Sequence, residues 1–418
     1  MKFIHTADIH LDSPLRGLAK YEGAPVEEIR NATRDALDNL VSLAIEESVD
    51  FIVIAGDIYD GDWKDHNTGL FFSKKMSELR RANIPVYLIS GNHDADNVMT
   101  KSLVLPENVI RFSTKRPETH KIEELQVAIH AQGFANRSVT ENLALNYPAP
   151  EPGWFNIGVL HTSLTGREGH DNYAPCSVAD LERLEYDFWA LGHVHTREEI
   201  ESDCPIWFSG NIQGRHIRET GAKGCSVVSF SESGHCSVEF VTLDVVRWAQ
   251  IIIDCSTLNV IDDLYKLFQT QLIDAKEGTG NRTLAVRVIL NGKCPIHSEL
   301  ASDTSGIANQ LRALASDIGS DIWLEKIVSR TTSDIGVLKK IGEDSPIGEL
   351  QDVIASIRGD QTAMDELSRQ FTQFIQKLPK ELIDTSGLNP IGSPEHLESI
   401  LEQVEPELLA RIQRSEIS

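Results

Sequence analysis

The sequence predicts an α/β protein with more than one domain, built around a mixed sheet or two packed sheets. Three observations carry this prediction. Strand and helix patterns alternate repeatedly near the N-terminus, which is typical of an α/β core. A strand-rich stretch with fewer helices follows, and the chain of 418 residues is longer than one hydrophobic core usually requires.

The alternating part consists of short apolar runs, each followed by a loop and an amphipathic segment. Apolar runs predict strands over Phe3–Ala7, Phe51–Ala55 and Val86–Ile89, and apolar positions at helical spacing predict helices over Glu28–Glu47 and Leu70–Arg81. The strand-rich stretch is expected to contain strands at Phe155–Leu160, Phe188–Leu191, Ile206–Phe208, Cys225–Phe230 and Cys236–Leu243.

The pattern changes twice in the C-terminal part. A second alternation predicts strands and helices at Gln250–Asp254, Ile261–Leu272, Leu284–Leu290, Ile307–Ala315 and Ile322–Val328. From Pro346 onward the strands vanish, and helices are expected at Ile347–Ile357, Met364–Ile375 and Leu397–Ile412. We therefore expect three domains, at residues 1–244, 245–340 and 341–418: a core, a small α/β domain and a helical region.

Composition limits the classes of function. The net charge is -24, from 63 acidic and 39 basic residues. A protein that binds nucleic acid on its own usually has an excess of basic residues, which this sequence does not have. Any DNA contact must then be local or metal-assisted. The six cysteines are scattered without a CxxC pair, which favours reduced thiols in the cytoplasm. No apolar run approaches the roughly 20 residues that span a bilayer, so we expect no membrane association.

Polar clusters follow five of the predicted strands. These clusters are Asp8-Ile9-His10, Gly56-Asp57, Gly91-Asn92-His93-Asp94, Leu160-His161 and Gly192-His193-Val194-His195. Loops that follow the strands of α/β sheets gather in a crevice, so the five clusters are expected to converge. In DxH and HxH, alternate residues of an extended segment could point the same way. Taken singly, each residue could be a solvated carboxylate, a turn amide or a core histidine. Five such clusters in order favour a metal site.

The residue types indicate which metals would bind. Carboxylates, imidazoles and one amide form a mixed oxygen and nitrogen set, which suits manganese, iron or zinc better than calcium. Two divalent ions would lower the pKa of a water molecule and neutralise phosphate oxygens during in-line attack. The nucleophile would then be hydroxide, and no cysteine lies within the five clusters.

The motifs DxH, GD, GNHD, strand-terminal H and GHxH resemble those of the calcineurin-like metallophosphoesterase family, over about Met1 to Leu243. The resemblance implies a four-layer α/β/β/α core with two packed mixed sheets. It also implies two divalent metal ions, for which Mn²⁺ is the first candidate. One ion would be held by Asp8, His10, Asp57 and His195, and the other by Asp57, Asn92, His161 and His193. Asp57 would bridge the two ions.

The same resemblance implies catalytic roles for two residues beside the metal ligands. His93 would protonate the leaving oxygen or stabilise the charge that builds on it, and Asp94 would orient the His93 imidazole.

Further segments suggest a substrate. The segment His5–Asp12 looks like the opening of the nuclease subunit of SbcCD-type DNA repair exonucleases, and Asn211–Cys225 resembles their YhaO-like branch. The segment Gly61–His66 departs from the SbcD pattern, which usually has a Ser/Pro-rich turn there. The resemblance implies a manganese-dependent DNA exonuclease or endonuclease. Residues 245–340 would cap the DNA path, and the C-terminal helices would dock on an SbcC-like ABC-type ATPase.

The sequence leaves alternatives for the substrate contacts, the partners and the function. Arg167, Arg215 and His216 are candidates for holding substrate phosphates, as are Arg218 and Lys223, but they could equally be solvated or paired within the chain. The apolar positions in Ile347–Ile357 could bind the ATPase or pack within their own domain. A homodimer is possible. A small-molecule phosphatase or phosphodiesterase, or a DNA-end-binding scaffold without catalysis, are the alternative functions.

Overall fold

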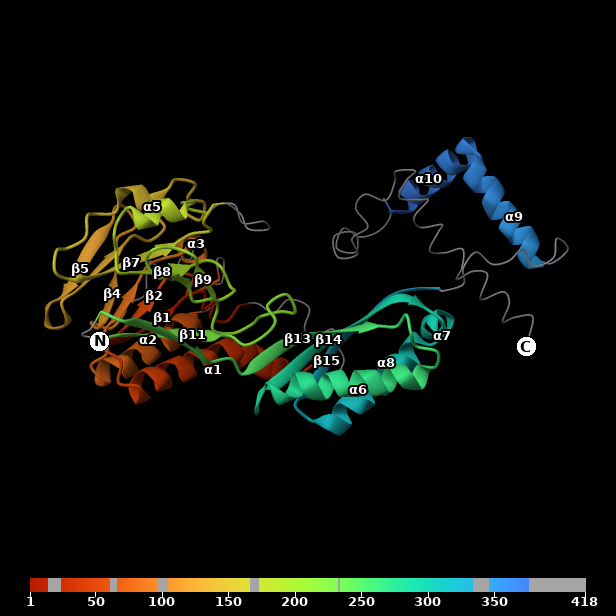
Figure 1. The fold of residues 1–418 in the computed structure, drawn as a ribbon, viewed down its shortest axis with the longest axis horizontal. Helices are drawn as coiled ribbons and strands as arrows, with labels where there is room; N and C mark the ends of the chain where they lie inside the picture. Colours follow the sequence, from red (N-terminus) through yellow and green to blue (C-terminus); the bar gives the residue numbers. More distant parts are fainter. Residues whose placement is uncertain are drawn as a thin grey trace. The chain divides into compact units, whose positions relative to one another are not determined.

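The computed structural model describes residues 1–13, 24–60, 66–96, 104–165, 173–231, 234–333 and 346–375 (Figure 1). The chain forms two compact units. Residues 1–250, 275–286 and 319–325 make the first, and the rest of the described chain belongs to the second. These units do not coincide with the domains expected from the sequence, whose boundaries at residues 244 and 340 stay a prediction. The expected helix at Leu397–Ile412 lies outside the described residues.

Two six-stranded sheets form the first unit. The order in one sheet is β12 (Cys236–Thr242), β11 (Gly224–Phe230), β1 (Lys2–Thr6), β2 (Phe51–Ile54), β3 (Val86–Leu88) and β4 (Val109–Arg111). The order in the other is β5 (Glu118–Ile122), β6 (Val127–Ala131), β7 (Phe155–His161), β8 (Phe188–Gly192), β10 (Ile206–Phe208) and β9 (Glu198–Ile200). Each sheet contains both parallel and antiparallel pairs, so both sheets are mixed.

Alternation along β2 shows how the layers pack. Phe51 and Val53 belong to the apolar cluster between the two sheets, whereas Ile52 and Ile54 face the cluster that includes helices α1 (Val26–Glu46) and α2 (His66–Arg81). The outer face of the second sheet packs on α5 (Val178–Glu182) and the 3₁₀ helix η3 (Leu143–Asn146). The predicted four-layer α/β/β/α core is confirmed. Two shorter helices are α3 (Asn92–Asp96) and η2 (Glu123–Leu125).

A third sheet has the order β13 (Val246–Asp254), β14 (Thr283–Cys294) and β15 (Ile322–Ser333). Its helices are α6 (Ile261–Glu277), α7 (His297–Ser302) and α8 (Thr304–Ile318). Helices α6 and α8 bury apolar residues four positions apart, which is a spacing that predicts a helix. The buried residues are Leu264, Phe268 and Leu272 on α6, and Ile307, Leu311 and Ala315 on α8.

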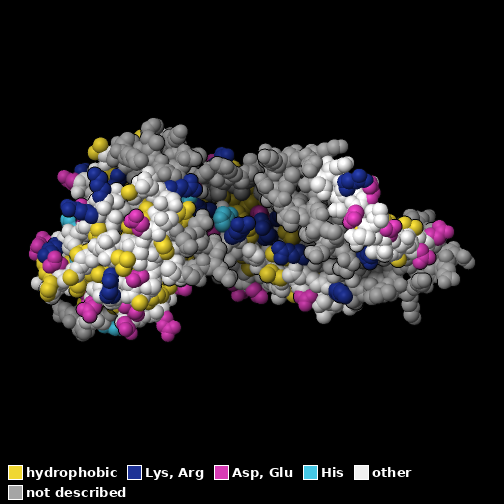
Figure 2. Space-filling view, turned by 90° about the horizontal axis from the view of Figure 1, so that it is seen from above, with side chains coloured by type: hydrophobic (Ala, Val, Ile, Leu, Met, Phe, Trp, Pro, Cys, Tyr) yellow, Lys and Arg dark blue, Asp and Glu magenta, His cyan; other side chains and the backbone are white. Residues whose placement is uncertain are grey.

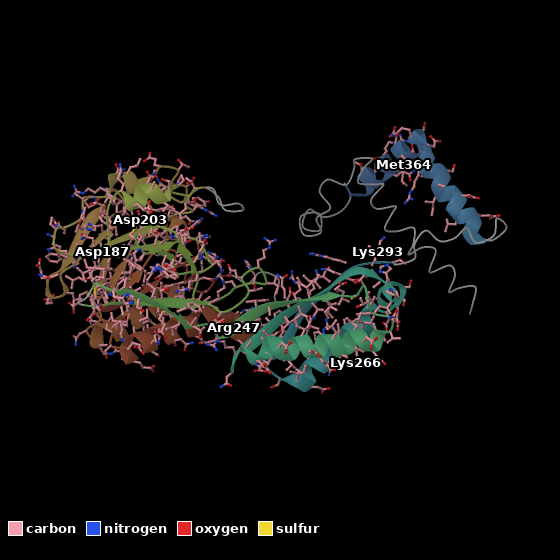
Figure 3. The ribbon with its side chains drawn as sticks, in the orientation of Figure 1. Asp187, Asp203, Arg247, Lys266, Lys293 and Met364 are labelled. Atoms are coloured by element: carbon pink, nitrogen blue, oxygen red, sulfur yellow. The ribbon has the colours of Figure 1, made fainter. Side chains whose placement is uncertain are left out.

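The helical C-terminal part is confirmed over two helices, α9 (Pro346–Gly359) and α10 (Gln361–Ile375), which contact each other. Ile354 on α9 and Met364 on α10 (Figure 3) are buried, whereas Val353 is 53% exposed. The predicted apolar stripe on α9 is therefore covered only in part. Among the helices that the structure describes, none is both long and apolar enough to cross a membrane.

Candidate metal centre

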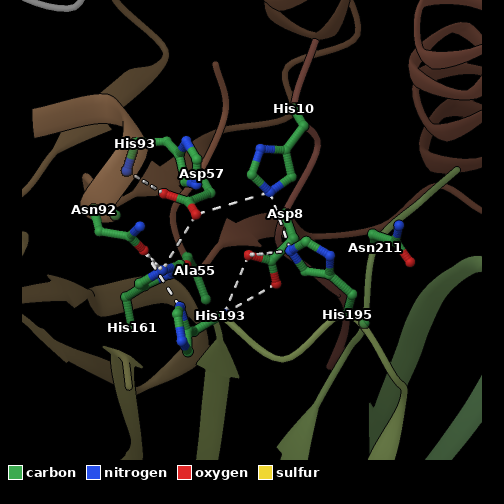
Figure 4. Close-up of polar contacts among 12 residues, drawn as sticks. Asp8, His10, Ala55, Asp57, Asn92, His93, His161, His193, His195 and Asn211 are labelled. Atoms are coloured by element: carbon green, nitrogen blue, oxygen red, sulfur yellow. Dashed lines mark hydrogen bonds and ion pairs between the residues drawn. The ribbon is translucent and has the colours of Figure 1, made fainter. Parts of the chain in front are cut away.

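All seven predicted metal ligands lie together at the ends of strands in both sheets (Figure 4). His161 is the last residue of β7, and the other ligands follow strands β1, β2, β3 and β8 in the chain. These are Asp8 and His10 after β1, Asp57 after β2, Asn92 after β3, and His193 and His195 after β8. Loops from five strands therefore converge, as the sequence predicted.

The backbone of these loops differs from the sequence expectation. Asp8, His10, Asp57 and His193 have φ angles of 52°, 45°, 55° and 99°. Non-glycine residues seldom adopt positive φ, and such conformations cluster at functional sites. The expectation that DxH and HxH are extended segments is wrong. The DxH loop instead turns sharply, and backbone hydrogen bonds from Asp8 N to Gly56 O and from His10 N to Asp57 O hold it (3.0 Å each).

One group of ligands, here called the His195 site, contains Asp8, His10 and His195. The Nε2 atoms of His10 and His195 lie 3.1 Å apart, and His195 Nε2 is 4.0 Å from Asp8 Oδ1. The His193 backbone N–H donates to both oxygens of Asp8, at 3.2 and 3.0 Å.

A second group, here called the His161 site, contains Asp57, Asn92, His161 and His193. Asn92 Oδ1 lies 2.9 Å from His161 Nε2 and 3.3 Å from His193 Nδ1. Asp57 Oδ2 is 3.5 Å from His161 Nε2 and also 3.8 Å from His10 Nε2. Asp57 therefore stands between the two sites, where the bridging role was expected.

Hydrogen bonds on the far side of three histidines fix their tautomers. His10 Nδ1 faces Asp60 Oδ1 at 2.8 Å, His195 Nδ1 faces Glu219 Oε1 at 2.7 Å, and His161 Nδ1 faces the Ala55 carbonyl at 2.9 Å. Since carboxylates and carbonyls only accept, each Nδ1 carries the hydrogen. Asp60 and Glu219 were not among the site residues predicted from the sequence.

These tautomers test whether the site fits a cation. With the hydrogens on Nδ1, the Nε2 atoms of His10 and His195 present lone pairs to each other at 3.1 Å. The Nε2 lone pair of His161 likewise faces the Asn92 oxygen. Facing lone pairs repel unless a proton or a cation lies between them, so the donor set fits divalent metal ions.

Burial and charge set the protonation of the ligands. Burial raises the pKa of Asp8 to about 6 and lowers the pKa of His10 to about 3. Burial also acts to raise the pKa of Asp57, but the charge of His161 and its hydrogen bond outweigh burial and hold that pKa well below its usual range. Against burial, Asp57 raises the pKa of His161 to about 9. Metal binding must therefore displace a proton from His161.

The catalytic candidates His93 and Asp94 lie beside the ligands, but their contacts differ from those expected. His93 Nδ1 is 3.3 Å from Asp60 Oδ1, so Asp60 is the carboxylate next to this imidazole. Asp94 accepts hydrogen bonds from the backbone N–H groups of Ile58, Tyr59 and Gly91 at 3.0 to 3.2 Å. Asp94 therefore ties the GD loop to the GNHD loop, and the orienting role expected of it stays a prediction.

Exposure shows the side from which a substrate can approach. Asp8, His10, Asp57 and His161 are at most 1% exposed, whereas the side chains of His93 and His195 are 30% and 26% exposed. The open side of the centre is therefore the side of His93.

The predicted substrate contacts have different environments. The Arg215 guanidinium lies against Glu219 and Asp60, whereas His216 has a side chain that is 54% exposed. Arg167 lies outside the described residues. Lys223 donates to the His195 carbonyl at 3.0 Å, whereas Arg218 is exposed.

Comparison with known proteins agrees with this geometry. The calcineurin-like phosphoesterase family matches residues 1–197, a range that contains all seven ligands. The middle domain of the metallophosphoesterase YhaO matches residues 248–332. The chain belongs to the calcineurin-like metallophosphoesterase superfamily, whose activity is metal-dependent hydrolysis of phosphoesters.

Within that superfamily the chain is homologous to YhaO. It is 34% identical over 299 residues to the uncharacterized metallophosphoesterase YhaO of Bacillus subtilis (strain 168), an overlap of 71% of this chain and 72% of that protein. Similar solved structures include TT1561 of Thermus thermophilus (12% identity, 57% of this chain, 98% of that chain, TM-score 0.34). Another is a dimetal phosphatase from Danio rerio (12% identity, 56% of this chain, 93% of that chain, TM-score 0.35).

Proposed function

We propose that this protein is a manganese-dependent DNA exonuclease or endonuclease, and the nuclease subunit of an ATPase-coupled DNA repair complex. The observation that carries the proposal is the convergence of seven oxygen and nitrogen ligands in two sites that meet at Asp57. When bound there, two divalent ions supply an activated water and neutralise phosphate charge. Hard oxygen and imidazole donors together suit Mn²⁺.

The residues of the chain position the metal ligands and supply a polar group for the leaving oxygen. Asp94 fixes the two loops that carry Asp57 and Asn92, so the ligands are preorganised before a substrate arrives. His93 is 30% exposed on the open side, and its Nδ1 faces Asp60. Its imidazole can therefore donate a proton or a hydrogen bond to the leaving oxygen while Asp60 holds the ring.

The likeness to DNA repair nucleases supports DNA as the substrate. The segment His5–Asp12 resembles the opening of the SbcCD nuclease subunit, and the same segment carries the ligands Asp8 and His10. Although the net charge is -24, Lys and Arg side chains gather beside a histidine on the face shown in Figure 2. Local positive charge can hold phosphates even where the average charge repels them.

A partner would supply the remaining positive surface. The helices α9 and α10 carry the apolar stripe in which Val353 stays 53% exposed, and we propose that this region docks on an SbcC-like ABC-type ATPase. Deleting the chain from Pro346 should abolish co-purification with that ATPase and leave hydrolysis of bis(p-nitrophenyl) phosphate unchanged. Co-purification of the truncated chain would remove the docking role. We also propose a homodimer, which is tested by measuring the mass of the purified protein in solution.

The substrate is tested by comparing hydrolysis of end-labelled linear DNA with that of nucleotide monophosphates, each with Mn²⁺, Mg²⁺ or Zn²⁺. We expect DNA cleavage with Mn²⁺, increased by the ATPase subunit and ATP. Cleavage of monophosphates alone would identify a small-molecule phosphatase. DNA-end binding without any hydrolysis, and without metal uptake, would identify a scaffold.

A further inference from the structure

Arg215 lies between the buried carboxylate of Glu219 and the partly buried carboxylate of Asp60, next to the His195 site. Its Nη2 atom is 3.1 Å from Glu219 Oε1, and its Nη1 atom is 3.6 Å from Asp60 Oδ1. The side chains of Arg215, Asp60 and Glu219 are 15%, 18% and 7% exposed. Ion pairs that are this sheltered are screened far less than surface pairs, so the guanidinium links the two carboxylates strongly.

Each of these carboxylates also holds one metal-ligating histidine. Asp60 accepts from His10 Nδ1 at 2.8 Å, and Glu219 accepts from His195 Nδ1 at 2.7 Å. Glu219 is itself fixed by the Arg215 backbone N–H at 2.8 Å and by Asn211 Nδ2 at 3.0 Å. A continuous chain of contacts therefore runs from one imidazole through Asp60, Arg215 and Glu219 to the other imidazole.

We propose that Arg215 is a positioning residue that binds Asp60 to Glu219, so that His10 and His195 present their Nε2 lone pairs to one cation together. Carboxylate partners of metal-binding histidines set the tautomer, aim the ring and raise its basicity. A guanidinium can span two carboxylates because its donors form a fixed planar fork, whereas an ammonium is a point charge. Both histidines of the His195 site thereby depend on one side chain that contacts no metal.

This role differs from the one first expected for Arg215, which was to hold a substrate phosphate. A phosphate at its guanidinium would have to displace Glu219 or compete with Asp60 in a sheltered position. Arg218 is the matched alternative, because it carries the same charge three residues later and is exposed. Among the described residues Arg218 has no ion-pair partner, so there it can meet a phosphate without breaking such a pair.

The inference rests on the metal-dependent activity in the proposed function, and not on DNA as the substrate. The test therefore uses Mn²⁺ binding to the metal-free full chain by calorimetry, and hydrolysis of bis(p-nitrophenyl) phosphate. The variants are Arg215→Met and Arg215→Lys, with Arg218→Met as the matched control for charge.

We expect both Arg215 variants to bind one of two Mn²⁺ ions about 10- to 100-fold more weakly, the range for lost partners of metal ligands. At limiting Mn²⁺, the electron paramagnetic resonance spectrum of the wild-type chain should show a coupled pair of ions. The spectra of the Arg215 variants should show a single ion. At saturating Mn²⁺ the KM should stay unchanged. Arg218→Met should retain both Mn²⁺ affinities. Unchanged Mn²⁺ affinity with a raised KM in Arg215→Met, restored in Arg215→Lys, would overturn the proposal in favour of phosphate binding.

Loss of folding in Arg215→Met is addressed by a second variant, because removing one charge leaves Asp60 and Glu219 uncompensated. The double variant Arg215→Met with Glu219→Gln removes a charge of each sign. It should recover thermal stability but retain the weakened Mn²⁺ site. Recovery of both properties would mean that the network acts only on stability and would refute the positioning role. If the wild-type chain does not cleave DNA but the expected Mn²⁺ results are obtained, only the proposed substrate is overturned.

Discussion

The two metal sites are supported in different ways. In the His161 site, two of the ligands have backbone partners: the Ala55 carbonyl holds His161, and the His93 backbone N–H donates to Asp57 Oδ1 at 2.9 Å. In the His195 site, both imidazoles are held by side-chain carboxylates, Asp60 and Glu219. A histidine held by a backbone carbonyl keeps its partner when neighbouring side chains change, whereas a histidine held by a carboxylate can lose its partner through a single substitution.

Asp57→Asn is the substitution with the largest expected effect, because Asp57 lies near both sites. An amide keeps the shape of Asp57 but loses the charge that binds a divalent ion and holds His161. We expect activity on bis(p-nitrophenyl) phosphate to fall about 10⁴-fold, which corresponds to several kcal/mol of transition-state stabilisation. Metal content by mass spectrometry should fall below two ions per chain. Retention of both ions with full activity would show that the sites do not share Asp57.

His93→Ala should reduce turnover and spare metal binding. The imidazole lies on the open side of the centre, with its ring centroid 4.9 Å from that of His10, and belongs to neither site. We expect kcat to fall about 10²- to 10³-fold, as for the loss of an acid or a transition-state donor, with two Mn²⁺ ions retained. The exposed His235 is the matched control, and His235→Ala should behave as wild type. A wild-type rate for His93→Ala would exclude this residue from the reaction.

The difference in support also explains what could be predicted from the sequence. Asp57, Asn92 and His193 lie in glycine-containing motifs directly after strands, so the local pattern alone identified them. Asp60 and Glu219 lie 50 and 24 residues from the histidines they hold, and only the folded chain brings them together.

The fold shows the same limit. The apolar runs of β1, β2 and β7 predicted these strands because nearly every residue in them is buried. Strand β4 has three residues, and β5 is mostly exposed, so their sequences lack an apolar run and were not predicted. Strand β6 is fully buried but was also missed.

Gly192→Ala should weaken the His161 site more than the His195 site. A Cβ atom at residue 192 would lie 2.1 Å from the Ala55 carbonyl oxygen, the group that holds His161. The strand must shift, at a typical cost of about 1–3 kcal/mol in the free energy of unfolding. Denaturant unfolding and Mn²⁺ calorimetry should show lower stability and one weakened ion. Gly278→Ala is the matched control, because a Cβ atom there meets nothing within 4 Å. Equal weakening of both ions would contradict separate support of the sites.

The smallest expected effect concerns His5, which contacts strand β8 beside Gly192. Its Nε2 atom donates to the Leu191 carbonyl at 3.1 Å, next to Gly192, and burial lowers the pKa of His5 to about 3. Between this value and the ordinary 6.5, the unfolded chain binds a proton that the folded chain excludes. Stability from the neutral ring is thus present above about pH 6.5 and is lost as the pH falls.

The matched variant for this pH effect is His5→Gln, which keeps a donor for the Leu191 carbonyl and does not titrate. Urea unfolding in EDTA should show that wild type loses about 1.4 kcal/mol more than His5→Gln between about pH 7.5 and pH 5.5. EDTA removes the contribution of bound metal, so the difference reports the ring alone. Identical pH dependence in the two proteins would mean that His5 takes up its proton in the folded state.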